Sequence, residues 1–233
     1  MWPPQGQAEQ VSDISRQMLK RLPSLPGVQA DYKLPEFADR TGVIVERSNY
    51  CTYSVSDTTL LDNLSGTLFP FLSAHSDRYI VPKLRFQGLA YSAGLVFPQD
   101  LRSIVTYTYS DPKVAETVAV IDKEAEQLEA LELTQEELDS YILNAYSVVT
   151  APTGNLDKYL TAMYQDMTGF DTKNWRRLVN EIRTTTLDDR EGAAEMLGTL
   201  LENQHLATAG NAQLIREEAD IFHKIYDYRG PLE

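Results

Sequence analysis

Residues 89–109 read LAYSAGLVFPQDLRSIVTYTY and predict two β-strands joined by a short turn. The strands, Leu89–Phe97 and Leu101–Tyr109, are rich in apolar, β-branched and aromatic residues. The turn between them is Pro98-Gln99-Asp100. A turn of this length joins strands that run in opposite directions, so the stretch predicts an antiparallel hairpin.

One strand and one helix are predicted before the hairpin. The β-branched and aromatic run from Gly42 to Val55 predicts the strand. Leucines at helical spacing between Leu60 and Leu72 predict the helix, with Asp57 or Thr58 as its cap. Pro70 lies inside this pattern, and we expect a kink or break there.

The part of the chain after the hairpin is predicted to be mostly helical. Thr134 and Glu137 have capping-box spacing, and Asp188 with Glu191 is expected to cap a later helix. Apolar residues at steps of three and four predict helices over 114–128, 138–149, 156–167, 175–182 and 193–201, followed by a short strand over 205–209 and a final helix ending near residue 226. The aromatic and methionine stripe is predicted to lie in the core; its members are Tyr141, Tyr159, Met163 and Tyr164.

This order of elements predicts an α+β fold. Strands come first, then a helical array, then one more strand, which favours an antiparallel sheet with helices packed mainly on one face. Residues 1–40 are expected to form an N-terminal helix over 9–22 and a Pro-rich linker arm. Residues 41–233 are expected to form one α+β domain, and the break at 150–155 is interpreted as a turn between helices.

The composition excludes several classes of protein. The 233 residues include 34 acidic and 21 basic ones, a net charge of −13, so the chain should repel the phosphates of nucleic acid. No run of about 18 apolar residues and no secretory signal occur, so we expect a soluble intracellular protein without membrane contact. Cytoplasm and mitochondrial matrix both remain open. The single cysteine, Cys51, excludes an internal disulfide and is expected to be buried.

No self-contained active site is recognisable. The histidines His75, His205 and His223 are too far apart in sequence for a local zinc motif, so each is interpreted as structural and no metal is expected in this chain. The acid-rich run between Asp122 and Asp139 is interpreted as the solvated face of two helices. Nucleophile-elbow and phosphate-loop motifs are also absent.

One segment, PKLRFQGLAYSAG over residues 82–94, carries a candidate site. Arg85 at the end of a predicted helix is followed by Tyr91 at the start of a strand, and Gly88 between them permits a tight turn. Such a pair could donate hydrogen bonds to a carbonyl or an oxyanion. Alternatively, Arg85 complements the helix dipole and Tyr91 packs in the sheet.

The same segment resembles the C-terminal repeat of the insulinase/pitrilysin zinc peptidases, most closely the presequence-protease branch. That branch has the pattern Leu-x-x-x-x-Arg-x-x-Gly-x-Ala-Tyr-Gly, and this sequence matches it at Arg85, Gly88, Ala90 and Tyr91. Three further segments fall in the family's order, so that the resemblance covers roughly residues 42–228; they are Thr108–Pro112 with Thr117, Leu133–Leu138 and Ala209–Asn211.

The resemblance implies half of a peptidase. In that family two homologous halves close around an unfolded peptide, and zinc and the glutamate base lie in the N-terminal half. The C-terminal half supplies an Arg/Tyr pair that holds the substrate, here Arg85 and Tyr91. The implied partners are therefore the zinc-binding N-terminal half, on the same polypeptide or a separate subunit, and an unfolded peptide. Zinc is expected in that missing half, with no cofactor in this chain.

Three departures from the family pattern leave a second hypothesis open. Leu89 and Ser92 stand where the branch has glycines, and Ser110 replaces an arginine. The first hypothesis is a non-catalytic C-terminal domain of a zinc metalloendopeptidase that degrades unfolded peptides, inactive as an isolated chain. The alternative is a structural or protein-interaction domain of the same fold without a role in peptide cleavage.

Overall fold

The computed structural model describes residues 17, 20, 38–46, 50–167 and 169–228. The chain divides into two compact units, Met1–Glu36 and Phe37–Glu233, which are treated separately. Apart from residues 17 and 20, the predicted helix over 9–22 lies outside the described residues, as does most of the Pro-rich arm, so both stay predictions.

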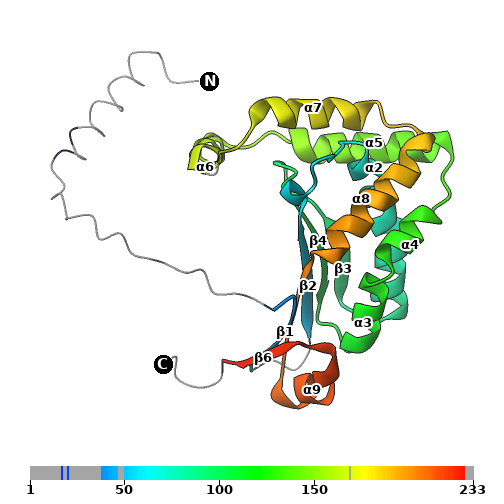
Figure 1. Cartoon of the computed structure of the whole chain (residues 1–233), viewed down its shortest axis with the longest axis vertical. Coiled ribbons are helices and arrows are strands. Elements are labelled where there is room, and N and C mark those ends of the chain that lie inside the picture. The colour runs from blue at the N-terminus through cyan, green and yellow to red at the C-terminus, as the bar shows by residue number, and fades with distance from the viewer. Residues whose placement is uncertain (1–16, 18–19, 21–37, 47–49, 168, 229–233) are drawn as a thin grey trace. The chain divides into compact units, whose positions relative to one another are not determined.

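A six-stranded mixed sheet organises the second unit (Figure 1), with the strand order β3-β4-β2-β5-β1-β6. β1 runs parallel to β5 and β6, whereas β2, β3, β4 and β5 are joined by antiparallel pairings. The α+β class is confirmed, and the sheet is mixed rather than wholly antiparallel because β1 inserts between the two C-terminal strands. The strands are β1 (Arg40–Ile44), β2 (Cys51–Asp57), β3 (Ser92–Val96), β4 (Ser103–Tyr109), β5 (His205–Gly210) and β6 (Lys224–Asp227).

The predicted hairpin is present as β3 and β4, which pair from Ser92 opposite Tyr109 to Val96 opposite Val105. The single strand predicted over 42–55 is wrong, because β1 and β2 are separate strands with different partners. The predicted final helix ends earlier than expected. It closes as α9 (Ala212–Glu217), and Tyr226 belongs to β6, where a short β-forming run pairs with β1.

Helices cover one face of the sheet (Figure 1). They are α2 (Leu68–His75), α3 (Val114–Ile121), α4 (Glu124–Glu129), α5 (Gln135–Thr150), α6 (Asn155–Met167), α7 (Thr172–Arg183), α8 (Arg190–Glu202) and α9, with the π-helical η2 (Ser76–Gln87) and the 3-10 turns η1 (Thr58–Leu60), η3 (Leu187–Asp189) and η4 (Ala219–Ile221). The exception is α6, which lies to the left in Figure 1, on the side of the sheet that the other helices leave open.

Three helix predictions need correction. The helix expected over 60–72 begins only at Leu68, so Pro70 falls in its first turn, where a missing N–H removes no intrahelical hydrogen bond. The helix expected over 114–128 is two helices, α3 and α4. The expected pair of Asp188 and Glu191 is replaced by a capping box of Thr186 and Asp189, whereas the box of Thr134 and Glu137 before α5 is confirmed.

The core contains two hydrophobic clusters. The larger includes α2, α5, α7 and α8 packed on β3 and β4, with Phe69 and Phe71 fully buried. The smaller joins Ile44 of β1 to apolar residues of α3, β5 and α9. Hydroxyl groups line the covered face of the central strands. The Thr52 and Thr208 hydroxyls lie 2.9 Å apart, and the Thr52 N–H donates to Thr108 Oγ1 at 3.2 Å. These buried hydroxyls of the central strands are therefore paired across the sheet, as burial requires.

Candidate functional site

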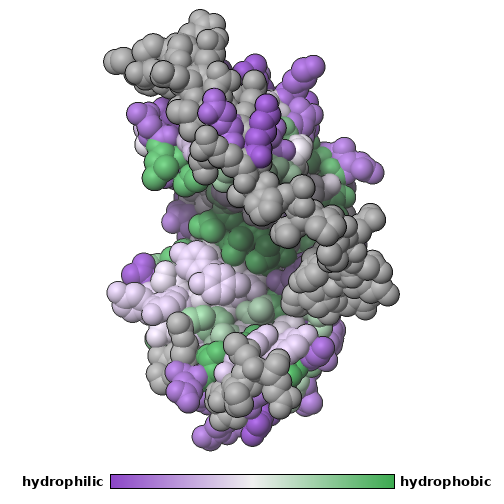
Figure 2. Space-filling model, turned by 90° about the vertical axis from the view of Figure 1, so that its left-hand side faces the viewer, coloured by the Kyte–Doolittle hydropathy of each residue, from purple (hydrophilic) through white to green (hydrophobic). Residues whose placement is uncertain are grey.

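The uncovered face of the sheet carries aromatic side chains. In β4, Ile104, Thr106 and Thr108 are buried under the helices, while the alternating residues Tyr107 and Tyr109 point to the other face. Tyr53 of β2 lies opposite Tyr107 and stacks on it, with ring centroids 6.3 Å apart. Figure 2 shows this side of the molecule, where pale residues of intermediate hydropathy lie below a hollow with hydrophobic residues at its floor.

Arg85 and Tyr91 lie just before β3, which is the edge strand of this face. Arg85 is exposed in the last turn of η2, and its guanidinium lies 5.7 Å from the ring centroid of Phe86. Tyr91 is 74% exposed just before β3, and its ring meets Tyr109 edge-on at 6.2 Å. Both polar groups are open to a ligand, and no hydrogen bond joins Arg85 to Tyr91 among the interactions of the described residues.

A tight turn connects the two residues. Gly88 has an ordinary negative φ of −78°, but a Cβ there would lie 2.6 Å from the Leu84 carbonyl oxygen, so the close backbone approach requires glycine. The left-handed residue is Leu89, at φ 72°. A leucine in this region is strained, whereas glycine adopts the same φ without a Cβ clash.

The stripe predicted for the core is exposed on α6. Tyr159, Met163 and Tyr164 have exposed fractions of 66%, 47% and 54%, and no residue of the helix is buried. This part of the prediction is wrong, because helical spacing shows that a face is apolar but not that another element covers it. Tyr141 is half-buried, and its hydroxyl donates to Asp77 at 2.8 Å.

The acid-rich run is solvated except at Glu124. The Glu124 side chain is fully buried under β4, and burial raises the pKa of its carboxyl to about 8. Neither carboxylate oxygen has a hydrogen-bond partner of good geometry in the described part of the chain, although the nearby Thr106 hydroxyl opposes the shift. The interpretation of the run as a solvated face is therefore wrong for this one residue.

The histidines do not meet. His75 is buried against the Tyr79 ring, and burial lowers the pKa of its imidazole to about 4. His205 is exposed at the start of β5, and His223 shares a hydrogen bond with Asp39. No group of three or more His, Cys, Asp or Glu side chains able to hold a metal occurs among the described residues.

Cys51 is buried in β2, as predicted. Within the described ranges, no helix is both long and apolar enough to cross a membrane. The predicted site residues did not include Tyr53, Tyr107 and Tyr109, although the alternation of tyrosine with threonine over 106–109 marks one face of a strand.

Comparison with known proteins identifies the fold. No family model matches the sequence. A peptidase M16 inactive domain from Pseudomonas fluorescens superposes with a TM-score of 0.56 at 13% identity, over 88% of this chain and 51% of that one. The chain has the fold of a peptidase M16 inactive domain. An insulinase-family protease from Yersinia pestis gives a TM-score of 0.52 at 12% identity, over 91% of this chain and 52% of that one.

The chain is also similar in sequence to Protein HypA of Clostridium perfringens. The two are 24% identical over 161 residues, which make up 69% of this chain but only 16% of HypA. The chain thus spans about half the length of the two solved chains named above and less than a fifth of HypA.

Proposed function

We propose that this chain is the non-catalytic C-terminal half of a zinc metalloendopeptidase of the presequence-protease branch. In this proposal its uncovered sheet face forms one wall of a chamber that holds an unfolded peptide. Zinc and the general base belong to a separate N-terminal half, which shares the polypeptide or is another subunit. The chain by itself neither holds zinc nor cleaves peptides.

The observation that carries the proposal is the uncovered aromatic face next to Arg85. A sheet face with exposed tyrosines offers flat apolar contacts and hydroxyl groups, which suit extended chains of varied sequence. The exposed apolar residues of α6 extend the same side of the molecule (Figure 1). With a net charge of −13, the chain attracts basic peptides at long range.

Arg85 and Tyr91 act together in this proposal as a clamp on the substrate backbone. An Arg guanidinium and a Tyr hydroxyl donate hydrogen bonds to a peptide carbonyl, and those bonds strengthen as the oxygen gains charge. The turn through Gly88 sets the spacing between the two donors. Neither residue exchanges a proton with the substrate.

A structural or protein-interaction domain is the second candidate function. The observation that favours it is α6, whose apolar residues resemble the contact face of a permanent partner rather than a transient peptide site. In this alternative the strained Leu89 only closes the turn, and the clamp has no substrate.

The proposal is tested by peptide turnover with the zinc-binding half added. We expect Arg85→Ala and Tyr91→Phe to lower kcat/KM roughly tenfold or more, the scale of one lost transition-state hydrogen bond. Lys83→Ala is the matched control, because Lys83 is an exposed cation on the same helix. Unchanged turnover in both clamp variants would favour the structural alternative, and one tight zinc per isolated chain would contradict the division of roles.

A further inference from the structure

An open cavity lies at the end of β4 opposite Tyr109. Its volume is about 260 Å³, and it is enclosed by the loop before β4, the residues after β2 and the start of α7. Trp175 and Phe170 form an aromatic part of the wall, and Leu101 forms another part. Leu101 has φ 58°, the left-handed region, although its side chain is fully buried.

Arg102 lines this cavity, and one nitrogen of its guanidinium is unsatisfied. Its Nη1 atom is buried and has no hydrogen-bond partner among the described residues. A buried donor on a charged group that lacks an acceptor destabilises the protein.

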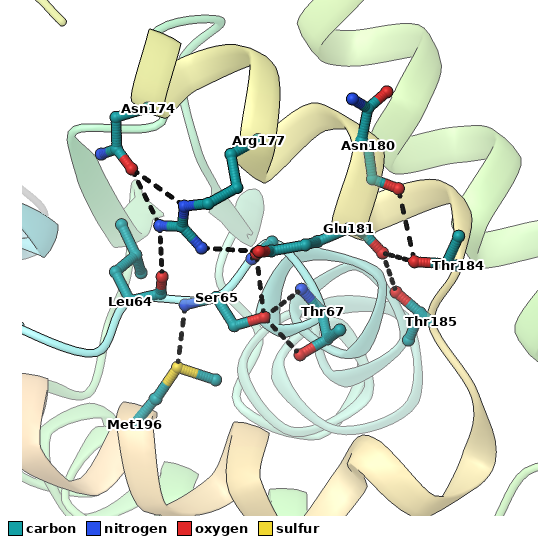
Figure 3. A network of polar contacts seen from close by, with 11 residues as sticks. Leu64, Ser65, Thr67, Asn174, Arg177, Asn180, Glu181, Thr184, Thr185 and Met196 are labelled. Carbon is teal, nitrogen blue, oxygen red and sulfur yellow. Dashed lines mark hydrogen bonds and ion pairs between the residues drawn. The ribbon is translucent and has the colours of Figure 1, made fainter.

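The second arginine of the cavity, Arg177, is already hydrogen-bonded to other groups of the protein, as Figure 3 shows. Arg177 donates to Glu181, to Asn174 Oδ1 and to the Leu64 carbonyl oxygen, at 2.6–3.2 Å. Glu181 in turn accepts from the Gly66 N–H at 2.8 Å. This network fixes one wall of the cavity, and it leaves Arg102 as the cation available to a ligand.

Three aspartates also border the cavity, but two of them already accept backbone hydrogen bonds and the third is exposed. Asp171 accepts from the Lys173 and Asn174 N–H groups and caps α7. Asp100 accepts the backbone N–H of Arg102 at 3.1 Å, and Asp62 is exposed. None of the three forms an ion pair with the Arg102 guanidinium within 4.0 Å in the described part of the chain.

We propose that this cavity binds a carboxylate of a peptide on Arg102, with an adjoining apolar side chain against Trp175 and Phe170. A planar guanidinium matches a carboxylate through paired hydrogen bonds. The aromatic walls favour a peptide whose carboxylate adjoins a large apolar residue. The carboxylate could be a peptide C-terminus or an acidic side chain. The proposal extends the proposed function by giving the same peptide a second anchor.

The test uses binding to the chain alone, so it can fail while the clamp of Arg85 and Tyr91 stands. In a Trp2→Phe background, Trp175 is the one tryptophan of the chain and its fluorescence reports the cavity. N-acetyl-phenylalanine is titrated against its amide, which lacks only the charge. We expect the acid to bind at least about tenfold more tightly than the amide, a difference of about 1.4 kcal/mol. Equal affinities would overturn the proposal.

Variants assign the effect to Arg102. We expect Arg102→Gln to reduce the affinity for the acid to that for the amide, and Arg102→Lys to reduce it in part, because lysine keeps the charge without the planar fork. Arg176→Gln removes an exposed charge from α7 and is the matched control. An equal loss in the control, or no loss in Arg102→Gln and Arg102→Lys, would overturn the proposal.

The source of the carboxylate is separated by two blocked dipeptides. Acetyl-Ala-Phe presents a C-terminal carboxylate, and acetyl-Asp-Phe-amide presents only a side-chain carboxylate. Binding of either one that depends on Arg102 supports the site and identifies its ligand. Binding of neither would overturn the proposal.

Discussion

The two faces of the sheet use the same strands in opposite ways. Along β4, Ile104, Thr106 and Thr108 are buried under the helices, whereas Tyr107 and Tyr109 alternate with them on the open face. The covered face holds the packed clusters and the paired hydroxyls, and the open face holds exposed rings. A single alternating pattern thus separates residues that stabilise the fold from residues available to a ligand.

The largest contrast is expected between a buried and an exposed ring. Phe69→Ala should lower the free energy of unfolding by about 3–5 kcal/mol, because Phe69 is fully buried in the larger cluster. Tyr53→Ala, on the open face, should lower it by less than about 1 kcal/mol. Urea denaturation of both variants measures the difference. Similar losses would show that the open face is packed in solution.

The covered face should also respond to pH through Glu124. Its folded-state pKa of about 8 lies above the usual 4.5, so folded protein holds a proton that unfolded chain releases. The contribution of this protonated carboxyl to the free energy of unfolding is fully present below about pH 4.5, and it is lost as the pH rises towards 8. Glu124→Gln should therefore stabilise the protein at pH 8 by roughly 2–4 kcal/mol and change little at pH 5.

Thermal unfolding of both proteins between pH 4 and 9 checks this prediction. His75 has the opposite dependence, since its lowered pKa of about 4 removes stability as the pH falls below 6.5. Glu124→Gln should leave that acid-side loss in place. An unchanged pH profile above pH 5 would contradict burial of an unpaired Glu124.

A smaller effect is expected at the turn that joins η2 to β3. Leu89→Gly should raise the free energy of unfolding by up to about 1 kcal/mol, because glycine adopts φ 72° without a Cβ clash but loses more chain entropy on folding. Leu89→Ala is the control, since alanine keeps the strain. Chemical denaturation is the readout, and equal effects of both substitutions would contradict the left-handed turn.

The smallest effect is expected on α6. Met163→Ser should change the free energy of unfolding by less than about 0.5 kcal/mol, because Met163 is half exposed and packs on no core cluster. The same denaturation experiment applies. A loss of about 2 kcal/mol would mean that another part of the chain covers the helix in solution.

Local patterns predicted most of the elements. The Pro98–Asp100 turn predicted the hairpin, and Thr134 with Glu137 predicted the start of α5, because these signals depend on residues close in sequence. The parallel pairing of β1 with β5 and β6 was not predictable, since it joins segments more than 150 residues apart. The apolar spacing of α6 also could not show whether another element packs on this helix.

The site was predictable only in part. Arg85 and Tyr91 were selected by a motif, and the structure adds that Tyr91 meets Tyr109. Arg102 carries no motif, because its importance comes from a cavity whose walls come from three separate segments. The burial of Glu124 was hidden in a run of similar acids, although it faces the sheet while its neighbours face solvent.

The central claim is that the open face binds an unfolded peptide at Tyr91 and Arg85. It is tested most directly by titrating a basic, unstructured peptide into this chain and into the double variant Arg85→Ala/Tyr91→Ala, with Lys83→Ala as control. We predict saturable binding that weakens at least about tenfold in the double variant, by about 1.4 kcal/mol, and is nearly unchanged in the control. Equal affinity of all three proteins for the peptide would contradict the claim.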